Sequence, residues 1–154
     1  MDENDSQLGR VVCVSGSHVV MIWEQEDHDR NDPERSRLQK GAVVKLRTPN
    51  GLVFGLVTGL TIPSPTKSLS ADEAWLAELE LIGEIGKESS SFRHGVSSFP
   101  TLGDPVWSTN RRDLNGIYAP SGESTITLGR LYNDHEEPIC VETDLLLGRH
   151  FAIL

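Results

Sequence analysis

The chain has 154 residues, of which 37% are hydrophobic, and its 14 basic and 23 acidic side chains give a formal net charge of -9. A chain of this length can bury a core without disulfides or metal. The acidic balance argues against a domain that itself grips nucleic acid, because neutralising phosphates needs a local excess of Lys and Arg. The 14 glycines and 8 prolines indicate many turns, which favours an all-β domain over a helical bundle.

The beginning of the chain predicts a tail followed by a hairpin. Residues 1–7 are acidic and polar and are expected to form a disordered tail. Strands are expected over residues 8–14 and 18–23, which are rich in valine, and Ser15-Gly16-Ser17 is expected to form the tight turn between them.

Long polar connections occur at residues 24–40, which are almost purely charged, and at residues 87–101, which are rich in serine. Connections of this length inside a compact domain are either mobile or used for contacts. These two loops are therefore the predicted docking elements.

A second hairpin is predicted around Pro-Asn-Gly at residues 49–51. Residues 41–48 alternate as a strand does, and Asn-Gly favours a tight type I′ turn. The return strand is expected over 52–62, and Gly55 and Gly59 within it indicate bulges that let a sheet curl.

Residues 71–86 fit two patterns. Ser70 and Glu73 have the spacing of a capping box, and apolar residues follow at helical spacing. A strand pattern competes, in which apolar residues from Ala77 to Ile85 alternate with glutamates. We favour a helical turn near 71–74 followed by a strand over 75–86.

The remaining elements are short. Gly103 to Trp107 is expected to be a turn that enters a strand, and residues 109–116 a helix with Ser108 or Thr109 as its N-cap and Gly116 as its stop. Strands are expected over 124–132 and 138–142. The whole chain is thus predicted as all-β, a small closed antiparallel β-barrel of about six to seven strands with one or two short helices.

Little in the sequence indicates chemistry. Cys13 and Cys140 lie in apolar runs and are predicted to be buried core thiols. The five histidines (His18, His28, His94, His135 and His150) have no metal-binding spacing. The tryptophans Trp23, Trp75 and Trp107 are expected to be core or interface anchors.

Three further patterns have ordinary structural explanations. Ser15 and Ser17 lack the flanking residues of a nucleophile elbow. Glu78, Glu80 and Glu84 are predicted to lie on the solvated face of a strand, and Arg111-Arg112 to be surface charge. No catalytic, cofactor-binding or metal-binding residue is predicted.

Several segments, in their order along the chain, resemble the N-terminal barrel, or HAS-barrel, of HerA-like hexameric DNA-translocating ATPases of the HerA/FtsK superfamily. These segments are Gly9-Arg10-Val11-Val12, Gly55–Gly59, Leu79–Gly83, Gly103-Asp104-Pro105-Val106, Leu128–Leu131, Pro138-Ile139 and Leu147–Leu154. In that family the last of them runs directly into the P-loop.

The resemblance implies a HAS-type barrel domain over residues 8–154, with the apolar run 145–154 leading, through a buried strand, into an absent ATPase domain. It implies no catalytic residue in this chain, and ATP and Mg²⁺ only in that downstream domain. The implied partners are the other protomers of a homo-hexameric ring and a nuclease or sirtuin-type effector. DNA is contacted only through the parent ring, in DNA end processing or antiviral defence.

No apolar run approaches the roughly 18 residues of a membrane span, and the first residues do not have the pattern of a signal peptide. A cytoplasmic location is therefore expected. Two other functions are weighed: an oligonucleotide-binding-type barrel that grips single strands, and a hydrolase that uses a Ser/His pair. The acidic charge and the 6% aromatic content disfavour the first.

Overall fold

A computed structural model describes residues 5–23, 38–62, 75–89, 91–118, 124–131 and 138–148. The chain divides into two compact units, residues 1–109 and 110–154. No helix in these described segments is long and apolar enough to cross a membrane.

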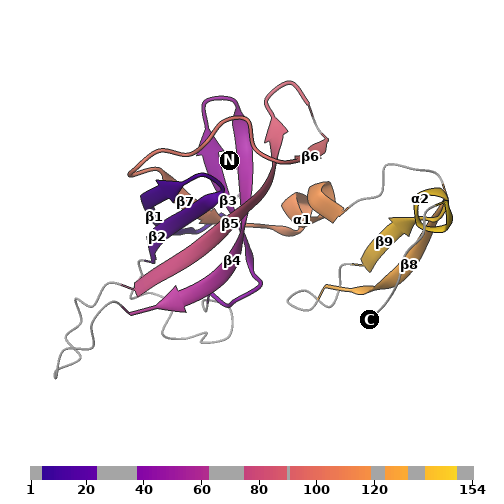
Figure 1. Ribbon diagram of the computed structural model, residues 1–154, viewed down its shortest axis with the longest axis horizontal. Coiled ribbons are helices and arrows are strands. Elements are labelled where there is room, and N and C mark those ends of the chain that lie inside the picture. The colour runs from indigo at the N-terminus through magenta and orange to yellow at the C-terminus, as the bar shows by residue number, and fades with distance from the viewer. Residues whose placement is uncertain are drawn as a thin grey trace. The chain divides into compact units, whose positions relative to one another are not determined.

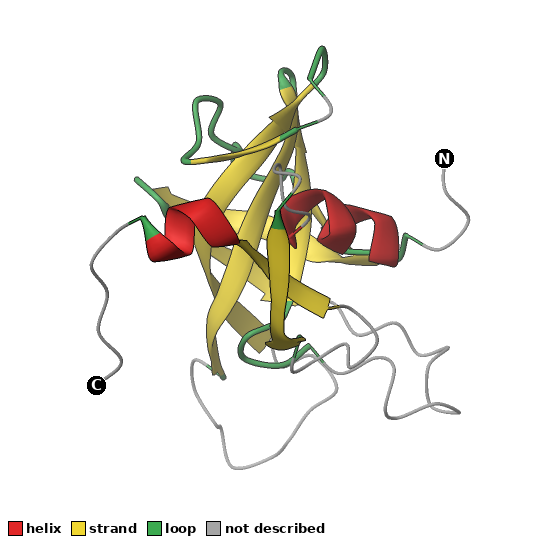
Figure 2. Cartoon of the chain, turned by 90° about the vertical axis from the view of Figure 1, so that its right-hand side faces the viewer, coloured by secondary structure: helices red, strands yellow, loops and turns green. Residues whose placement is uncertain are grey.

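The first unit is a closed barrel. Its strands are β1 (Gln7–Ser15), β2 (His18–Trp23), β3 (Val43–Thr48), β4 (Gly51–Thr61), β5 (Trp75–Gly86), β6 (Phe92–His94) and β7 (Pro105–Ser108). Six of them pair antiparallel in the order β2-β1-β7-β3-β4-β5, and a further pairing of β2 with β5 closes the ring (Figure 1). Figure 2 shows the same strands turned by 90°. The predicted small antiparallel barrel is confirmed, and β6 is an extra strand beside β5.

The barrel wall encloses one apolar core. The described side chains that fill it include Val11, Met21, Leu46, Leu79 and Val106, which are all at most 1% exposed. They come from five different strands, because alternate residues of each strand point inward. Burial of this continuous apolar surface is the main stabilising contribution to the first unit.

The β3–β4 hairpin turns where the sequence indicates, but with a different geometry. Thr48 pairs with Gly51, so the two loop residues are Pro49 and Asn50. A type I′ turn requires positive φ at both loop residues, whereas the proline ring fixes φ near about -65°. Among the described residues only glycines have positive φ. The predicted type I′ turn is therefore wrong.

The register shifts at four positions of the wall. In the β4–β5 pair the register shifts between Phe54 and Gly55 and between Val57 and Gly59, next to the two glycines that predicted them. The first of these shifts leaves Ile82 of β5 without a partner in the β4–β5 register. In the β1–β7 pair the register shifts between Gln7 and Gly9. In the β1–β2 pair a bulge makes Val12 the extra residue.

The bulge in β1 overturns one sequence prediction. Cys13 was expected in the core, but its side chain is exposed. Because Val12 is an extra residue, the alternation after Val11 changes face, and Val14 packs against the core in place of Cys13. Cys140 is half-buried rather than buried, and both thiols are free.

The region with two competing patterns is a strand over Trp75–Gly86, as favoured. The helical turn expected near 71–74 lies outside the described residues. At the other end of the unit, β1 begins at Gln7, and Asp5 hydrogen-bonds to Lys45. The described part of the predicted disordered tail is therefore held in place by a charged contact.

The second unit contains α1 (Arg111–Tyr118), β8 (Thr125–Arg130), β9 (Pro138–Glu142) and α2 (Thr143–Leu147). Strands β8 and β9 pair antiparallel as expected, but they form a two-stranded sheet of their own and are not barrel strands. The strand predicted to close the chain falls in residues 149–154, outside the described part, and Leu145–Leu147 before it is helical.

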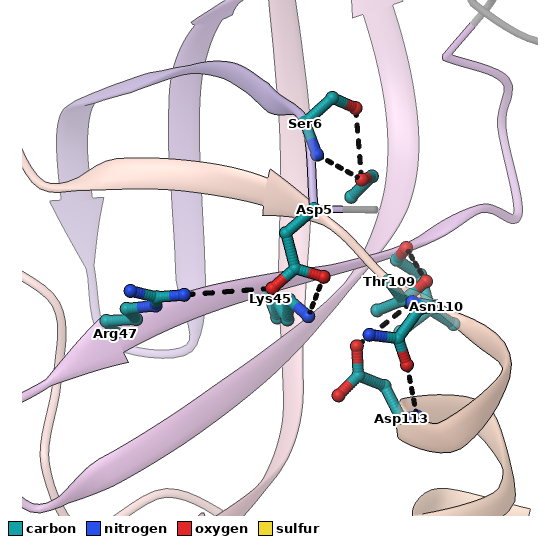
Figure 3. A network of polar contacts seen from close by, with 9 residues as sticks. Asp5, Ser6, Lys45, Arg47, Thr109, Asn110 and Asp113 are labelled. Carbon is teal, nitrogen blue, oxygen red and sulfur yellow. Dashed lines mark hydrogen bonds and ion pairs between the residues drawn. The ribbon is translucent and has the colours of Figure 1, made fainter. Parts of the chain in front are cut away.

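Helix α1 begins at Arg111, two residues after the predicted start at residue 109. The Asp113 N–H donates to Asn110 Oδ1 at 3.0 Å, and the Asn110 N–H donates to Asp113 Oδ2 at 2.9 Å, a reciprocal capping box (Figure 3). Asn110 is thus the N-cap. Thr109 is not, because its hydroxyl donates to the Val43 carbonyl at 2.8 Å. Gly116 lies inside the helix rather than at its end.

Candidate docking surface

The site begins with Glu84, which was predicted to lie on a wet strand face. The alternation of β5 holds from residue 77 to residue 81, and the side chains of Ala77, Leu79 and Leu81 are buried in the core. Ile82 is the extra residue of a bulge, so the alternation changes beyond it, and Glu84 pairs with the core residue Val53. Paired residues of neighbouring strands point to the same side of a sheet. Glu84 therefore faces inward and is only 9% exposed.

The buried carboxylate of Glu84 holds the segment after β6. Ser97 donates its hydroxyl to Oε1 at 2.6 Å and its backbone N–H to Oε2 at 2.8 Å. Arg93 Nη2 lies 3.2 Å from Oε1. The Ser97 hydroxyl bond, followed by its backbone bond, lowers the pKa of Glu84, and contacts with Ser98 and Arg93 act in the same direction against the opposing effect of burial.

Residues 95–104, which we call the barrel-end loop, are fixed at several further points. Val96 packs against the core, and Pro100 is buried. At the far end of the loop, Gly103 N–H donates to the Val11 carbonyl at 2.8 Å, and Val11 N–H donates to the Asp104 carbonyl at 2.9 Å. Figure 1 shows the connection running from β6 across the barrel to β7. The loop is therefore a fixed part of the barrel.

This fixed loop presents apolar side chains to solvent. Phe99 is 47% exposed and Leu102 is 70% exposed. Val12, the bulged residue of β1 that follows Val11, is 37% exposed. We call these three residues the loop docking surface. Exposed apolar side chains on a rigidly held loop are typical of a protein contact, because little conformational entropy is lost when they are covered.

The second predicted docking loop, residues 24–40, lies outside the described residues except for its last three. Of these, Leu38 belongs to the hydrophobic core. The structure describes residues 87–89 and 91–101 of the other predicted docking loop, so the surface of that loop can be specified. One signal for its anchor is present in the sequence: Gly83, next to Ile82, lies where the alternation of β5 breaks.

Where the structure describes them, the other residues considered for chemistry form no reactive group of three. Ser17 donates to Glu80 Oε1 at 2.6 Å, and His18 Nδ1 lies 2.8 Å from Glu80 Oε2. Ser17 thus bonds to a carboxylate and not to a histidine. In the described part of the chain no three His, Cys, Asp or Glu side chains gather as a metal site would require. His28, His135 and His150 lie outside it.

The tryptophans and the arginine pair occupy different positions. Trp23 is buried and its ring meets that of Trp75 edge-on at 5.3 Å, while Trp75 is 44% exposed. Trp107 lies in β7 under the guanidinium of Arg47, 5.1 Å from the ring centroid. Arg111-Arg112 are exposed at the start of α1, as expected for surface charge.

No family model matches the chain, and no curated protein matches it.

Proposed function

We propose that the chain is a non-catalytic assembly and partner-docking domain. In detail, it is the HAS-type barrel of a HerA-like ring ATPase that works with a nuclease or a sirtuin-type effector in DNA end processing or antiviral defence. The loop docking surface is the observation that supports docking most directly. A ring of such protomers is cytoplasmic and contacts DNA through its ATPase domains, with the barrel as the attachment point for the effector.

The second unit supports the assembly role. None of its described residues is buried, and Ile126, Leu128, Leu145 and Leu147 are between 42% and 71% exposed. A segment with apolar side chains and no buried residue gains its stability from burial against another surface. Contact with a neighbouring protomer or with the ATPase domain would provide that burial.

The charge of the chain indicates the partner's chemistry. With 23 acidic against 14 basic side chains, the domain attracts a basic protein surface during encounter. Apolar contact at Phe99 and Leu102 would then hold the complex, because charge contributes more to the association rate than to the final affinity.

The test compares two aspartate substitutions in the parent protein, which is co-expressed with a candidate nuclease or sirtuin-type effector. Leu102→Asp adds a charge to the loop docking surface and is expected to reduce the co-purified effector at least about tenfold, a loss of about 1.4 kcal/mol. Leu60→Asp is the matched control, because Leu60 is 42% exposed in β4, toward the end of that strand opposite Gly51.

Equal retention of the effector by both variants would contradict the proposed docking surface. Both substitutions are at exposed positions, so both variants are expected to keep the fold. Binding of a labelled oligothymidine by the barrel, weakened by salt, would instead support the oligonucleotide-binding function.

A further inference from the structure

A lysine is buried on the outer wall of the barrel. Val44 and Leu46 of β3 are core residues, so Lys45 between them points outward. It pairs across the ladder with Trp107 of β7. An outward lysine normally extends into water, yet the Lys45 side chain is only 4% exposed. Something therefore covers it.

The cover is the segment before β1. Asp5 Oδ1 lies 2.8 Å from Lys45 Nζ, and Asp5 Oδ2 lies 3.7 Å from Arg47 Nη2, so one carboxylate joins both cations (Figure 3). The segment is also held by its backbone, because Ser6 N–H donates to Ser108 Oγ at 3.1 Å and Ser108 N–H donates to the Ser6 carbonyl at 2.9 Å.

Trp107 completes the group. The Arg47 guanidinium lies over its ring at 5.1 Å. Its indole Nε1 is buried, and none of the described residues accepts a hydrogen bond from it. A buried donor without an acceptor is unfavourable. Asp5 therefore pairs with the Lys45 and Arg47 cations but does not accept a hydrogen bond from Trp107 Nε1.

We propose that Lys45, Arg47 and Trp107 form a binding site for a carboxylate on an extended peptide. Asp5 fills this site as an internal ligand, and an acidic segment of a partner protein competes with it. A buried ion pair stabilises a fold no better than apolar residues of the same size, so stability alone does not account for this one. The site is separate from the loop docking surface and does not depend on it.

The bound segment itself indicates the class of ligand. Asp5 presents a carboxylate, and the backbone of the neighbouring Ser6 bonds to Ser108 twice: its N–H donates to the hydroxyl, and its C=O accepts from the backbone N–H. An extended peptide is thus recognised by backbone and side chain together. A nucleic acid would bring no backbone N–H or C=O for the Ser108 contacts, and the net charge of -9 opposes it. An acidic peptide is therefore the favoured ligand.

The test uses the full chain and a labelled peptide that copies residues 1–8 (Met-Asp-Glu-Asn-Asp-Ser-Gln-Leu). In Asp5→Asn the internal ligand loses its charge, so the peptide is expected to bind at least about tenfold more tightly than to the unmodified chain. The indole N–H resonance of Trp107, assigned with Trp107→Phe, is expected to shift on binding. A peptide with Asn at its fifth position is the matched control and is expected not to bind.

Two further variants keep the result decisive. Ser6→Pro removes, from the internal segment alone, the N–H that donates to Ser108 Oγ, and it changes neither a charge nor the site, so this variant is also expected to bind the peptide more tightly. Asp5→Asn combined with Lys45→Met removes both buried charges and is expected to stay folded and not to bind. The proposal is overturned if Ser6→Pro and a folded Asp5→Asn bind no better than the unmodified chain, or if oligothymidine binds in place of the peptide.

Discussion

At the scale of single residues, Glu84 shows how a charge inside a barrel can hold a surface loop. Its carboxylate accepts two bonds from Ser97 and lies beside Arg93, which fixes both sides of the bend after β6. Charge-assisted bonds of this kind are stronger than neutral ones. The position of the loop docking surface therefore depends on the ionised form of one side chain.

This dependence predicts a pH effect. Because the pKa of folded Glu84 lies below its ordinary value of 4.5, the carboxylate contributes stability that is fully present above the unfolded pKa. That contribution is lost as the pH falls through the lower, folded pKa. Glu84→Gln is thus expected to lower the melting temperature near neutral pH, and the difference from the unmodified chain is expected to narrow below pH 4.5. Thermal unfolding followed by circular dichroism measures both.

Glu78→Gln is the control for this experiment. Glu78 belongs to the same strand but is exposed, and replacement of an exposed side chain has little effect on stability. If the melting-temperature difference between Glu84→Gln and the unmodified chain stays constant across the pH range, the negative charge of Glu84 does not contribute to the stability, and the expected pH effect is wrong.

At the scale of elements, β6 can lie beside the barrel because Gly83 has no side chain. Phe54 of β4 is fully buried although it belongs to no part of the inner core, and its ring meets that of Phe92 in β6 at 6.0 Å. A Cβ at Gly83 would overlap the Phe92 ring and the Arg93 carbonyl. A small second apolar layer thus exists outside the wall.

Gly83→Ala is therefore expected to destabilise the domain by about 1–3 kcal/mol, the usual range for overpacking. Part of the overlap is with a backbone carbonyl and cannot be relieved by a rotamer change. Gly55→Ala in the paired strand is the matched control, because its new Cβ would lie no closer than 3.5 Å to Leu79. Urea unfolding measures the free energy of unfolding of both variants. An equal loss of stability in the two would argue against the close approach of β6 to Gly83.

The elements differ in how far the sequence predicted them. Alternation and turn residues were sufficient to predict the hairpins and strand β5. Both signals are local properties of the chain, so they can be read from the sequence. Gly55 indicated a bulge in β4, but the sequence did not show that Ile82 of β5 would be the extra residue, since that depends on how β5 pairs with β4. The residues of β5 beyond Ile82 therefore point to the opposite face from the one that simple alternation predicts. Glu84, which was assigned to the solvated face, is one of them. The separation of β8 and β9 from the barrel likewise depends on which strands pair, a property that alternation does not specify.

At the scale of the whole chain, the two units are expected to differ in local stability. The barrel closes on itself, so its strands have partners on both sides. Within the described residues, strands β8 and β9 pair only with each other, all six residues of β8 are exposed, and α2 has five residues. Two-stranded sheets and short helices are marginal by themselves in water.

Amide hydrogen exchange on the intact chain tests this difference. The amides of β8 and β9 are expected to exchange at least about a thousandfold faster than those of Val44 and Leu46, because the hairpin opens locally while the barrel opens only by global unfolding. Addition of the proposed ATPase domain or neighbouring protomer is expected to slow exchange in β8 and β9 and to leave exchange in the barrel unchanged. Equal protection of both units in the isolated chain would mean that residues 110–148 are already covered, and their assembly role would then lose its physical basis.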